Sequence, residues 1–251
     1  MKHAFLGHAY EESDYSKAIS LFKDFIQIQQ ISTNEIAANL AKGKIYGLFE
    51  GASEFGPRAL GHRSIIADSR NKDIWKFINR WIKFREDFRP FAPAVPVDDA
   101  ETFFEISTPS PYMLRAVKVR EKYQKDLGAV THLNGLARIQ TVDKQILPRF
   151  HDILTGFGKI TGYPILVNTS LNVRGQPLIE TPEQAIEILL CTHLDGVIFE
   201  NTLITTSFNY EDVLAESSMF TFAPDMLLKS QVSSYGKNLI LETLYRKKNV
   251  K

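Results

Sequence analysis

The sequence lacks the features that mark secreted, membrane-spanning and metal-cluster proteins. Its 251 residues include a single cysteine, Cys191, which excludes an intrachain disulfide and a cysteine-based metal cluster. No apolar run approaches the roughly 20 residues of a membrane-spanning helix, and the N-terminus has no apolar core of the signal-peptide kind. The six histidines show no metal-site spacing. We therefore expect a cytoplasmic protein that holds no metal of its own and binds no membrane.

The chain also lacks an excess of charge of one sign. Thirty basic and 29 acidic residues give a formal charge of +1, so no overall signal indicates nucleic acid as a partner. The segment from Arg58 to Arg89, however, holds nine basic and four acidic residues. This excess suits a compact anionic ligand, because guanidinium groups bind phosphate with two hydrogen bonds at once. For Lys72, Lys76 and Arg80, a solvated helix face is the alternative interpretation.

Apolar residues recur at helical spacing in some segments and in short continuous runs in others. Helices are predicted over residues 13–29, 34–41, 72–82, 148–161 and 182–192, and strands over 45–49, 111–119, 136–142, 164–167, 196–199 and 203–206. Such a mixture around one core indicates an α/β or α+β domain. We expect this domain to cover residues 1–208, followed by a less regular extension over 209–251.

Two arginines lie in a loop that follows one of the predicted strands. The segment EFGPRALGHRS (54–64) holds Arg58 and Arg63, together with glycines that allow a backbone to approach a ligand closely. Pro57 stiffens the turn, which limits the entropy lost when the arginines hold an anion. A structural turn with surface arginines is the alternative.

A second charged segment, KFREDFRPFAP (83–93), places a lysine two residues before an arginine. In an extended chain Lys83 and Arg85 point to the same side, where an ammonium and a guanidinium together can hold a phosphate and offset charge in phosphoryl transfer. Arg89 follows in the same segment. An exposed charged turn between phenylalanines is the alternative.

Two further segments place polar side chains next to apolar strands. In VNTSLN (167–172), Ser170 and Asn172 share the two-residue offset of Lys83 and Arg85, although an Asx or Ser turn without a ligand explains the pattern equally well. In THLNGLARIQTV (131–142), Arg138 and Gln140 are predicted on one side of a strand. A lone histidine such as His132 is more often structural than catalytic.

These four segments occur in an order that resembles a known family. EFGPRALGHRSI, KFREDFRPFAP, ARIQTV and GYPILVNTSLNVRGQPLIETPEQAI together resemble the C-terminal domain of the nodulation-type O-carbamoyltransferases, over about residues 4–206. The resemblance implies a YrdC-like fold, a twisted α/β sheet flanked by helices around a basic cavity. It also implies that carbamoyl phosphate and ATP, with Mg²⁺ as part of the ATP complex, react there to give carbamoyl adenylate.

The resemblance also implies roles for particular residues. The family's Lys-x-Arg and Ser-x-Asn pairs fall on Lys83/Arg85 and Ser170/Asn172, as catalytic residues. Further substrate contacts are expected at Arg58, Arg63, Arg89, Arg138, Asn168 and Thr169. The sequence departs from the family at Glu50, Ala52 and Asn134, where Gln, Arg and Asp are usual.

In that family a separate N-terminal domain of the actin-like (ASKHA) type binds iron and passes the carbamoyl group to an acceptor hydroxyl. The resemblance leaves no segment of this chain for such a domain, so we expect it as a partner domain or subunit. Two other hypotheses remain open: a non-catalytic nucleotide- or RNA-binding module, and a scaffold subunit for a separate catalytic chain. A threonylcarbamoyl-adenylate role is a further enzymatic variant.

Overall fold

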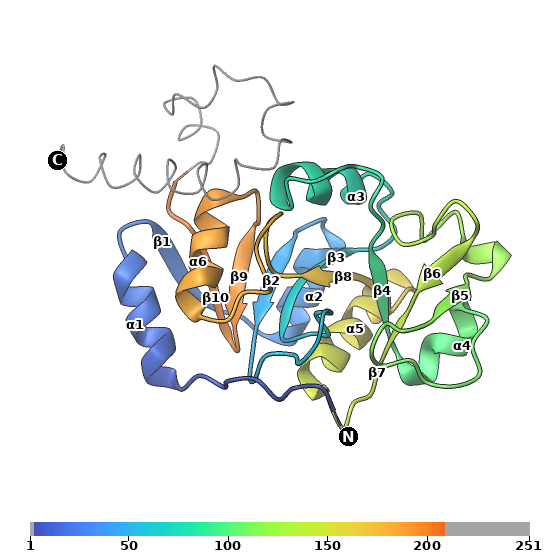
Figure 1. Cartoon of the computed structure of the whole chain (residues 1–251), viewed down its shortest axis with the longest axis horizontal. Coiled ribbons are helices and arrows are strands. Elements are labelled where there is room, and N and C mark those ends of the chain that lie inside the picture. The colour runs from blue at the N-terminus through green and yellow to red at the C-terminus, as the bar shows by residue number, and fades with distance from the viewer. Residues whose placement is uncertain (1–2, 209–251) are drawn as a thin grey trace, which may run out of the picture.

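One eight-stranded sheet separates two layers of helices in the computed structural model, which describes residues 3–208 (Figure 1). The strand order is β1-β10-β9-β2-β3-β8-β4-β7, and β5 and β6 form a small second sheet. The large sheet is mixed, because β2 runs parallel to β9 and β4 parallel to β7, whereas the other pairs are antiparallel. This arrangement confirms the predicted α/β class. No helix within residues 3–208 has both the length and the apolar character needed to cross a membrane.

The helices and strands have the following bounds. The helices are α1 (Glu12–Phe22), α2 (Thr33–Ala41), α3 (Ile74–Phe77), α4 (Ala100–Phe103), α5 (Pro148–Thr161) and α6 (Pro182–Cys191), with a π-helix at Ile78–Ile82 and 3₁₀ turns at Val97–Asp99 and Glu121–Tyr123. The strands are β1 (Ile26–Gln30), β2 (Tyr46–Phe49), β3 (Arg63–Asp68), β4 (Ala92–Pro96), β5 (Ala116–Lys118), β6 (Leu136–Arg138), β7 (Gln140–Val142), β8 (Leu166–Ser170), β9 (Gly196–Phe199) and β10 (Thr202–Thr206).

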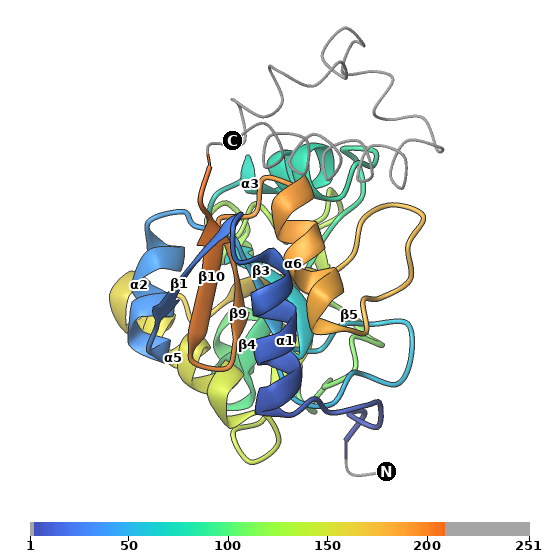
Figure 2. The ribbon, with the colours of Figure 1, turned by 90° about the vertical axis from the view of Figure 1, so that its left-hand side faces the viewer.

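The two helical layers bury separate apolar cores against the two faces of the sheet (Figure 2). Helices α1 and α6 pack together on one face, and α2 and α5 on the other. Local sequence explains where these helices begin and end. Ser32 and Thr181 form capping boxes at the starts of α2 and α6, Pro148 occupies the first turn of α5, and Gly162 ends α5 in the left-handed conformation.

Four predictions of secondary structure are wrong in part. The helix predicted over 13–29 ends at Phe22, and Ile26–Gln30 instead forms an edge strand paired with β10. The predicted strand 111–119 is reduced to β5. The strand predicted over 136–142 divides at Ile139, since β6 joins the small sheet and β7 the large one. The helix predicted over 72–82 changes to a π-helix after Phe77.

Strands β3 and β4 were not predicted, and β4 contains two prolines. Pro93 lies opposite Val167 of β8, whereas β4 pairs with β7 only from Ala94 onward. Pro96 is the last residue of the strand. Because the two ladders are offset, Pro93 is paired only with β8 and Pro96 only with β7. Neither proline therefore removes hydrogen bonds on both sides of β4.

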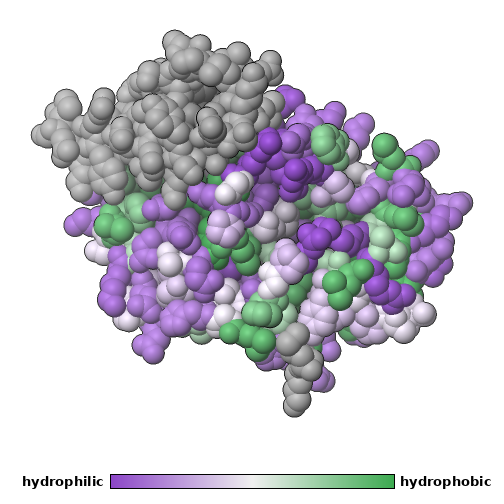
Figure 3. All heavy atoms as spheres, viewed as in Figure 1, coloured by the Kyte–Doolittle hydropathy of each residue, from purple (hydrophilic) through white to green (hydrophobic). Residues whose placement is uncertain are grey.

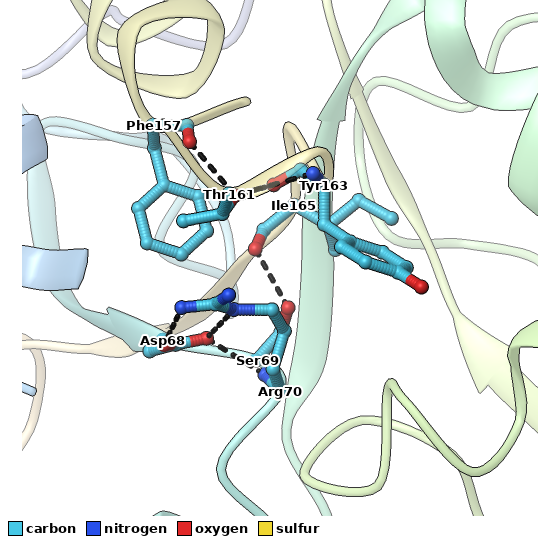
Figure 4. A network of polar contacts seen from close by, with 7 residues as sticks. All are labelled: Asp68, Ser69, Arg70, Phe157, Thr161, Tyr163 and Ile165. Atoms are coloured by element: carbon cyan, nitrogen blue, oxygen red, sulfur yellow. Dashed lines mark hydrogen bonds and ion pairs between the residues drawn. The ribbon is translucent and has the colours of Figure 1, made fainter. Parts of the chain in front are cut away.

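The start of β8 is held by a polar network at the end of α5 (Figure 4). The Ser69 hydroxyl donates to the carbonyl of Ile165 at 2.6 Å, and the Thr161 hydroxyl donates to the carbonyl of Phe157 at 2.8 Å. Asp68 accepts two hydrogen bonds from the Arg70 guanidinium, at 3.0 and 2.7 Å. Strand β8 leaves this network between β3 and β4 and ends at Ser170.

Residues 209–251, for which a less regular extension was predicted, lie outside the described residues. On the face shown in Figure 3, apolar residues are interspersed among hydrophilic ones.

Candidate functional site

Lys83 contacts both members of the Ser-x-Asn pair at the end of β8. Its Nζ donates to the Ser170 carbonyl at 2.6 Å, to Ser170 Oγ at 3.0 Å and to Asn172 Oδ1 at 2.6 Å. Ser170 Oγ in turn donates to Asn172 Oδ1 at 2.7 Å, and Asn172 Nδ2 donates to the carbonyl of Gln176 at 2.7 Å. The structure therefore brings Lys83 to both members of a pair that is far away in the sequence.

The backbone around Lys83 explains this contact. Lys83 directly follows the π-helix, a local widening that is frequent at functional sites. The next residue, Phe84, has a φ of +49°, which turns the chain away from the helix. The Lys83 carbonyl accepts a hydrogen bond from the backbone N–H of Arg174 at 3.0 Å. The segments 83–89 and 170–176 are therefore joined by main chain as well as side chains.

Lys83 is only 3% exposed. Burial, and secondly the neighbouring Arg85, lower the pKa of Lys83 well below its usual range. Its three acceptors nevertheless match the three N–H groups of an ammonium. The hydrogen bonds favour the charged form and burial favours the neutral one. An anion placed beside Lys83 would shift this balance towards the charged form.

Arg85 is held by Asn79 rather than by a carboxylate. Its Nε donates to Asn79 Oδ1 at 2.6 Å, and its guanidinium lies 5.0 Å from the centre of the Phe91 ring. Burial, followed by the charge of Arg89, lowers the pKa of Arg85 to about 10. Asn79 is fully buried and also donates to the Arg89 carbonyl at 2.9 Å. Two-residue spacing does not indicate Asn79, although a polar residue among the apolar positions of 74–82 is a usable signal.

Four other arginines extend the positive charge around Arg85. Burial is the main cause of the lowered pKa of both Arg85 and Arg138. The half-buried Arg138 lowers the pKa of Arg85 further, and the exposed Arg58 lowers that of Arg138 further. Arg138 also contributes, after burial, to lowering the pKa of His132. Arg89 pairs with Glu86 at 3.1 Å, and Arg174 pairs with the same carboxylate at 3.2 Å. Arg58, Arg85, Arg89 and Arg138 are therefore close enough to repel one another, which favours an anionic ligand.

Arg63 occupies a different environment from the other predicted contacts. Its side chain is fully buried, and the guanidinium carbon lies 3.6 Å from the centre of the Phe49 ring. The guanidinium donates to the carbonyls of Glu50 at 2.6 Å, Gly51 at 3.0 Å and His62 at 3.2 Å. Because Ser64, not Arg63, lies opposite Ser170, Arg63 points to the other face of the sheet. The structure therefore does not bring Arg63 to Lys83.

Asn168 is 1% exposed and lies two residues before Ser170, on the same face of β8. Its Nδ2 donates to Gln140 Oε1 at 2.7 Å. Thr169 is partly exposed and points to the opposite face. The expectation that Arg138 and Gln140 share one side of a strand is wrong, because they belong to β6 and β7, in different sheets.

Glu50, one of the departures from the family pattern, lies in a second polar environment. Its carboxylate accepts a hydrogen bond from Arg149 Nε at 2.5 Å. Arg149 also donates to Asn201 Oδ1 at 2.6 Å and to the carbonyl of Glu200. Burial raises the pKa of Glu50 to about 7 in spite of this ion pair. A cavity of about 340 Å³ lies beside the pair and is also lined by His62.

The cluster around Lys83 consists of hydrogen-bond donors with few carboxylates. It suits a phosphorylated ligand and charge stabilisation during phosphoryl transfer. Within residues 3–208, no group of three or more His, Cys, Asp or Glu side chains is arranged to hold a metal ion.

Residues 37–209 match the family model described as "Carbamoyltransferase C-terminus". The chain is 45% identical over 171 residues to nodulation protein NolNO of Sinorhizobium fredii, covering 66% of this chain and 25% of that protein. It is 38% identical over 176 residues to nodulation protein U of the same organism, covering 69% and 31%.

An uncharacterized protein of Methanocaldococcus jannaschii is 36% identical over 203 residues, covering 79% of this chain and 33% of its own. The chain therefore spans about a third or less of the length of these relatives. Among solved structures, HypF of T. kodakarensis aligns with a TM-score of 0.42 and 15% identity, over 70% of this chain and 24% of that one.

Proposed function

This chain belongs to the carbamoyltransferase C-terminus family, and from that premise we propose that it binds carbamoyl phosphate and ATP and forms carbamoyl adenylate. The observation that carries the proposal is the contact of Lys83 with Ser170 and Asn172, next to Arg85. Two anionic substrates must approach each other here, so their charges have to be offset. Lys83, Arg85, Arg58 and Arg138 supply positive charge, and Ser170 and Asn172 supply groups that orient the ligand.

The proposed reaction balances with one water molecule. Water cleaves the bond between phosphorus and the carbamoyl oxygen, which releases phosphate and leaves carbamate. A carbamate oxygen then forms a bond to the α-phosphorus of ATP, and pyrophosphate leaves. ATP brings Mg²⁺ with its phosphates, as is usual for this substrate. The chain's own contribution is to position the two substrates and to offset the charge that develops on the phosphoryl oxygens.

A partner then takes the carbamoyl group. The chain spans about a third or less of the length of its relatives, and we propose that an actin-like, metal-binding domain or subunit transfers the group to an acceptor hydroxyl. The neighbouring gene, or the protein that co-purifies with the chain, identifies this partner.

The test is to incubate the purified chain with carbamoyl phosphate, ATP and Mg²⁺ and to measure phosphate and pyrophosphate. Both products are expected in equal amounts, and omission of either substrate should abolish pyrophosphate. If neither product forms, with or without an actin-like partner, the proposal is wrong. A scaffold subunit predicts a different result: the activity of a reconstituted complex would survive Lys83→Ala and Arg85→Ala. For an RNA-binding module, binding would weaken steeply with salt and would not require ATP.

A further inference from the structure

Asn168 carries a buried hydrogen-bond acceptor that the proposed chemistry has not yet used. Its Oδ1 is buried and has no hydrogen-bond partner among the described residues. Leaving a buried polar atom unpaired costs about 1–3 kcal/mol, and such atoms are rare in native proteins. Asn168 lies on the same face of β8 as Ser170, so this oxygen is a candidate for direct ligand contact.

The orientation of the Asn168 amide follows from a backbone carbonyl. Gln140 Nε2 donates to the Leu60 carbonyl at 2.6 Å, so Gln140 Oε1 must point the other way. Asn168 Nδ2 donates to that Oε1 at 2.7 Å and lies 3.4 Å from the Ala59 carbonyl. Rotating either amide by 180° would place two oxygens against each other. The Leu60 carbonyl cannot rotate in this way, so Oδ1 is the unpaired atom.

The other hydrogen-bond acceptors near the end of β8 are already paired. The Ser170 carbonyl, Ser170 Oγ and Asn172 Oδ1 all accept hydrogen bonds from Lys83. The surrounding arginines offer donors only. Asn168 and Ser170 are two positions apart on one strand face, which corresponds to about 7 Å. This strand face therefore presents an unpaired acceptor about 7 Å along the strand from Ser170, whose Oγ contacts the Lys83 ammonium.

We propose that Asn168 Oδ1 accepts a hydrogen bond from the amino group of the carbamoyl moiety and so selects carbamoyl phosphate over other acyl phosphates. This inference rests on the proposed function. The carbamoyl group differs from an acetyl group of nearly the same size by having N–H donors in place of a methyl group. A buried acceptor that meets a methyl group stays unpaired, whereas one that meets an N–H is satisfied. The Ala59 and Leu60 carbonyls of the Arg58–Leu60 loop lie beside the two amides.

The test compares carbamoyl phosphate, acetyl phosphate and inorganic phosphate as ligands of the full chain, by calorimetry. The wild-type protein is expected to bind carbamoyl phosphate on the order of tenfold to a hundredfold more tightly than acetyl phosphate. In Asn168→Leu this preference should fall to within about twofold, while the affinity for inorganic phosphate stays the same. Ser69→Ala removes a different buried hydrogen bond, at the start of β8, and should keep the full preference.

Two results would overturn the inference while leaving the proposed function intact: equal wild-type affinities for the two acyl phosphates, or an unchanged preference in Asn168→Leu. Wild-type protein that binds neither carbamoyl phosphate nor ATP would overturn both proposals. If Asn168→Leu does not fold, equal wild-type affinities for the two acyl phosphates still overturn the inference, because that comparison needs no variant.

Discussion

Lys83 Nζ lies 2.6 Å from Asn172 Oδ1, although 89 positions separate the two residues in the sequence. The contact joins the segment after the π-helix to the segment after β8. Both segments carry the short pairs that sequence spacing singled out, Lys83/Arg85 and Ser170/Asn172. The catalytic role of these residues stays a prediction.

Lys83→Met should abolish pyrophosphate formation. The substitution keeps an unbranched side chain of similar length in the buried position but removes the charge and the three donors. We expect a loss of at least about a hundredfold, because removing a group that stabilises charge in a transition state typically has an effect of that size. Lys76→Met, on the exposed side of α3, is the matched control and should retain full activity. Equal rates for the two variants would contradict the assignment.

Asn79→Leu should weaken substrate binding through Arg85. Asn79 holds Arg85 Nε and the Arg89 carbonyl, so its loss lets both arginines move. We expect the KM for carbamoyl phosphate to rise about tenfold with a smaller change in kcat, since about 1–1.5 kcal/mol is typical for one buried hydrogen bond. Steady-state kinetics at constant ATP measures this. A purely structural role would instead lower the melting temperature and leave KM unchanged.

Glu50→Gln should change how stability depends on pH. The pKa of Glu50 is raised to about 7 in the folded protein, from 4.5, so between these values the folded state binds more protons than the unfolded state. Its contribution to stability is therefore fully present below about pH 4.5 and is lost as pH rises to about 7. The loss is on the order of 3 kcal/mol. Glutamine keeps an acceptor for Arg149 but does not titrate.

Urea unfolding of both proteins at pH 5, 6, 7 and 8 measures this difference. We expect wild-type stability to fall relative to Glu50→Gln between pH 5 and 7 and to run parallel to it above pH 7. Profiles that are parallel throughout would show that Arg149 holds the carboxylate charged at every pH tested.

Gly61→Ala should destabilise the fold through backbone strain and through overpacking, and Gly43→Ala is the control that separates the two. Gly61 has a φ of +127°, and a Cβ there would lie 2.8 Å from Phe150 Cδ1. Gly43, at +92°, has no atom within 4 Å of such a Cβ, so Gly43→Ala measures the backbone cost with no contact. We expect Gly61→Ala to lower the free energy of unfolding by about 1–3 kcal/mol more than Gly43→Ala, since overpacking costs that much. Equal losses would show that Phe150 moves aside freely.

Local sequence rules predicted much of the fold. The helix over 148–161 has the predicted bounds, because Pro148 and Gly162 mark its ends without help from other segments. The predicted strand 196–199 is likewise found as β9. Residues 26–30 were placed in a helix and are a strand, because β10 offers them a hydrogen-bonded edge. That edge is formed by residues about 175 positions away, and no local pattern reports it.

The candidate site, like the fold, is predicted only in part by the sequence. Residue types and two-residue spacing made Lys83, Arg85, Ser170 and Asn172 candidates, and the family resemblance implied their catalytic role. Spacing did not reveal that Arg63 is turned to the other face, that Asn79 holds Arg85, or that Asn168 keeps an unpaired oxygen. Each of these depends on the strand that lies alongside and on the face to which a side chain points. Both follow from long-range packing, which a one-dimensional pattern does not contain.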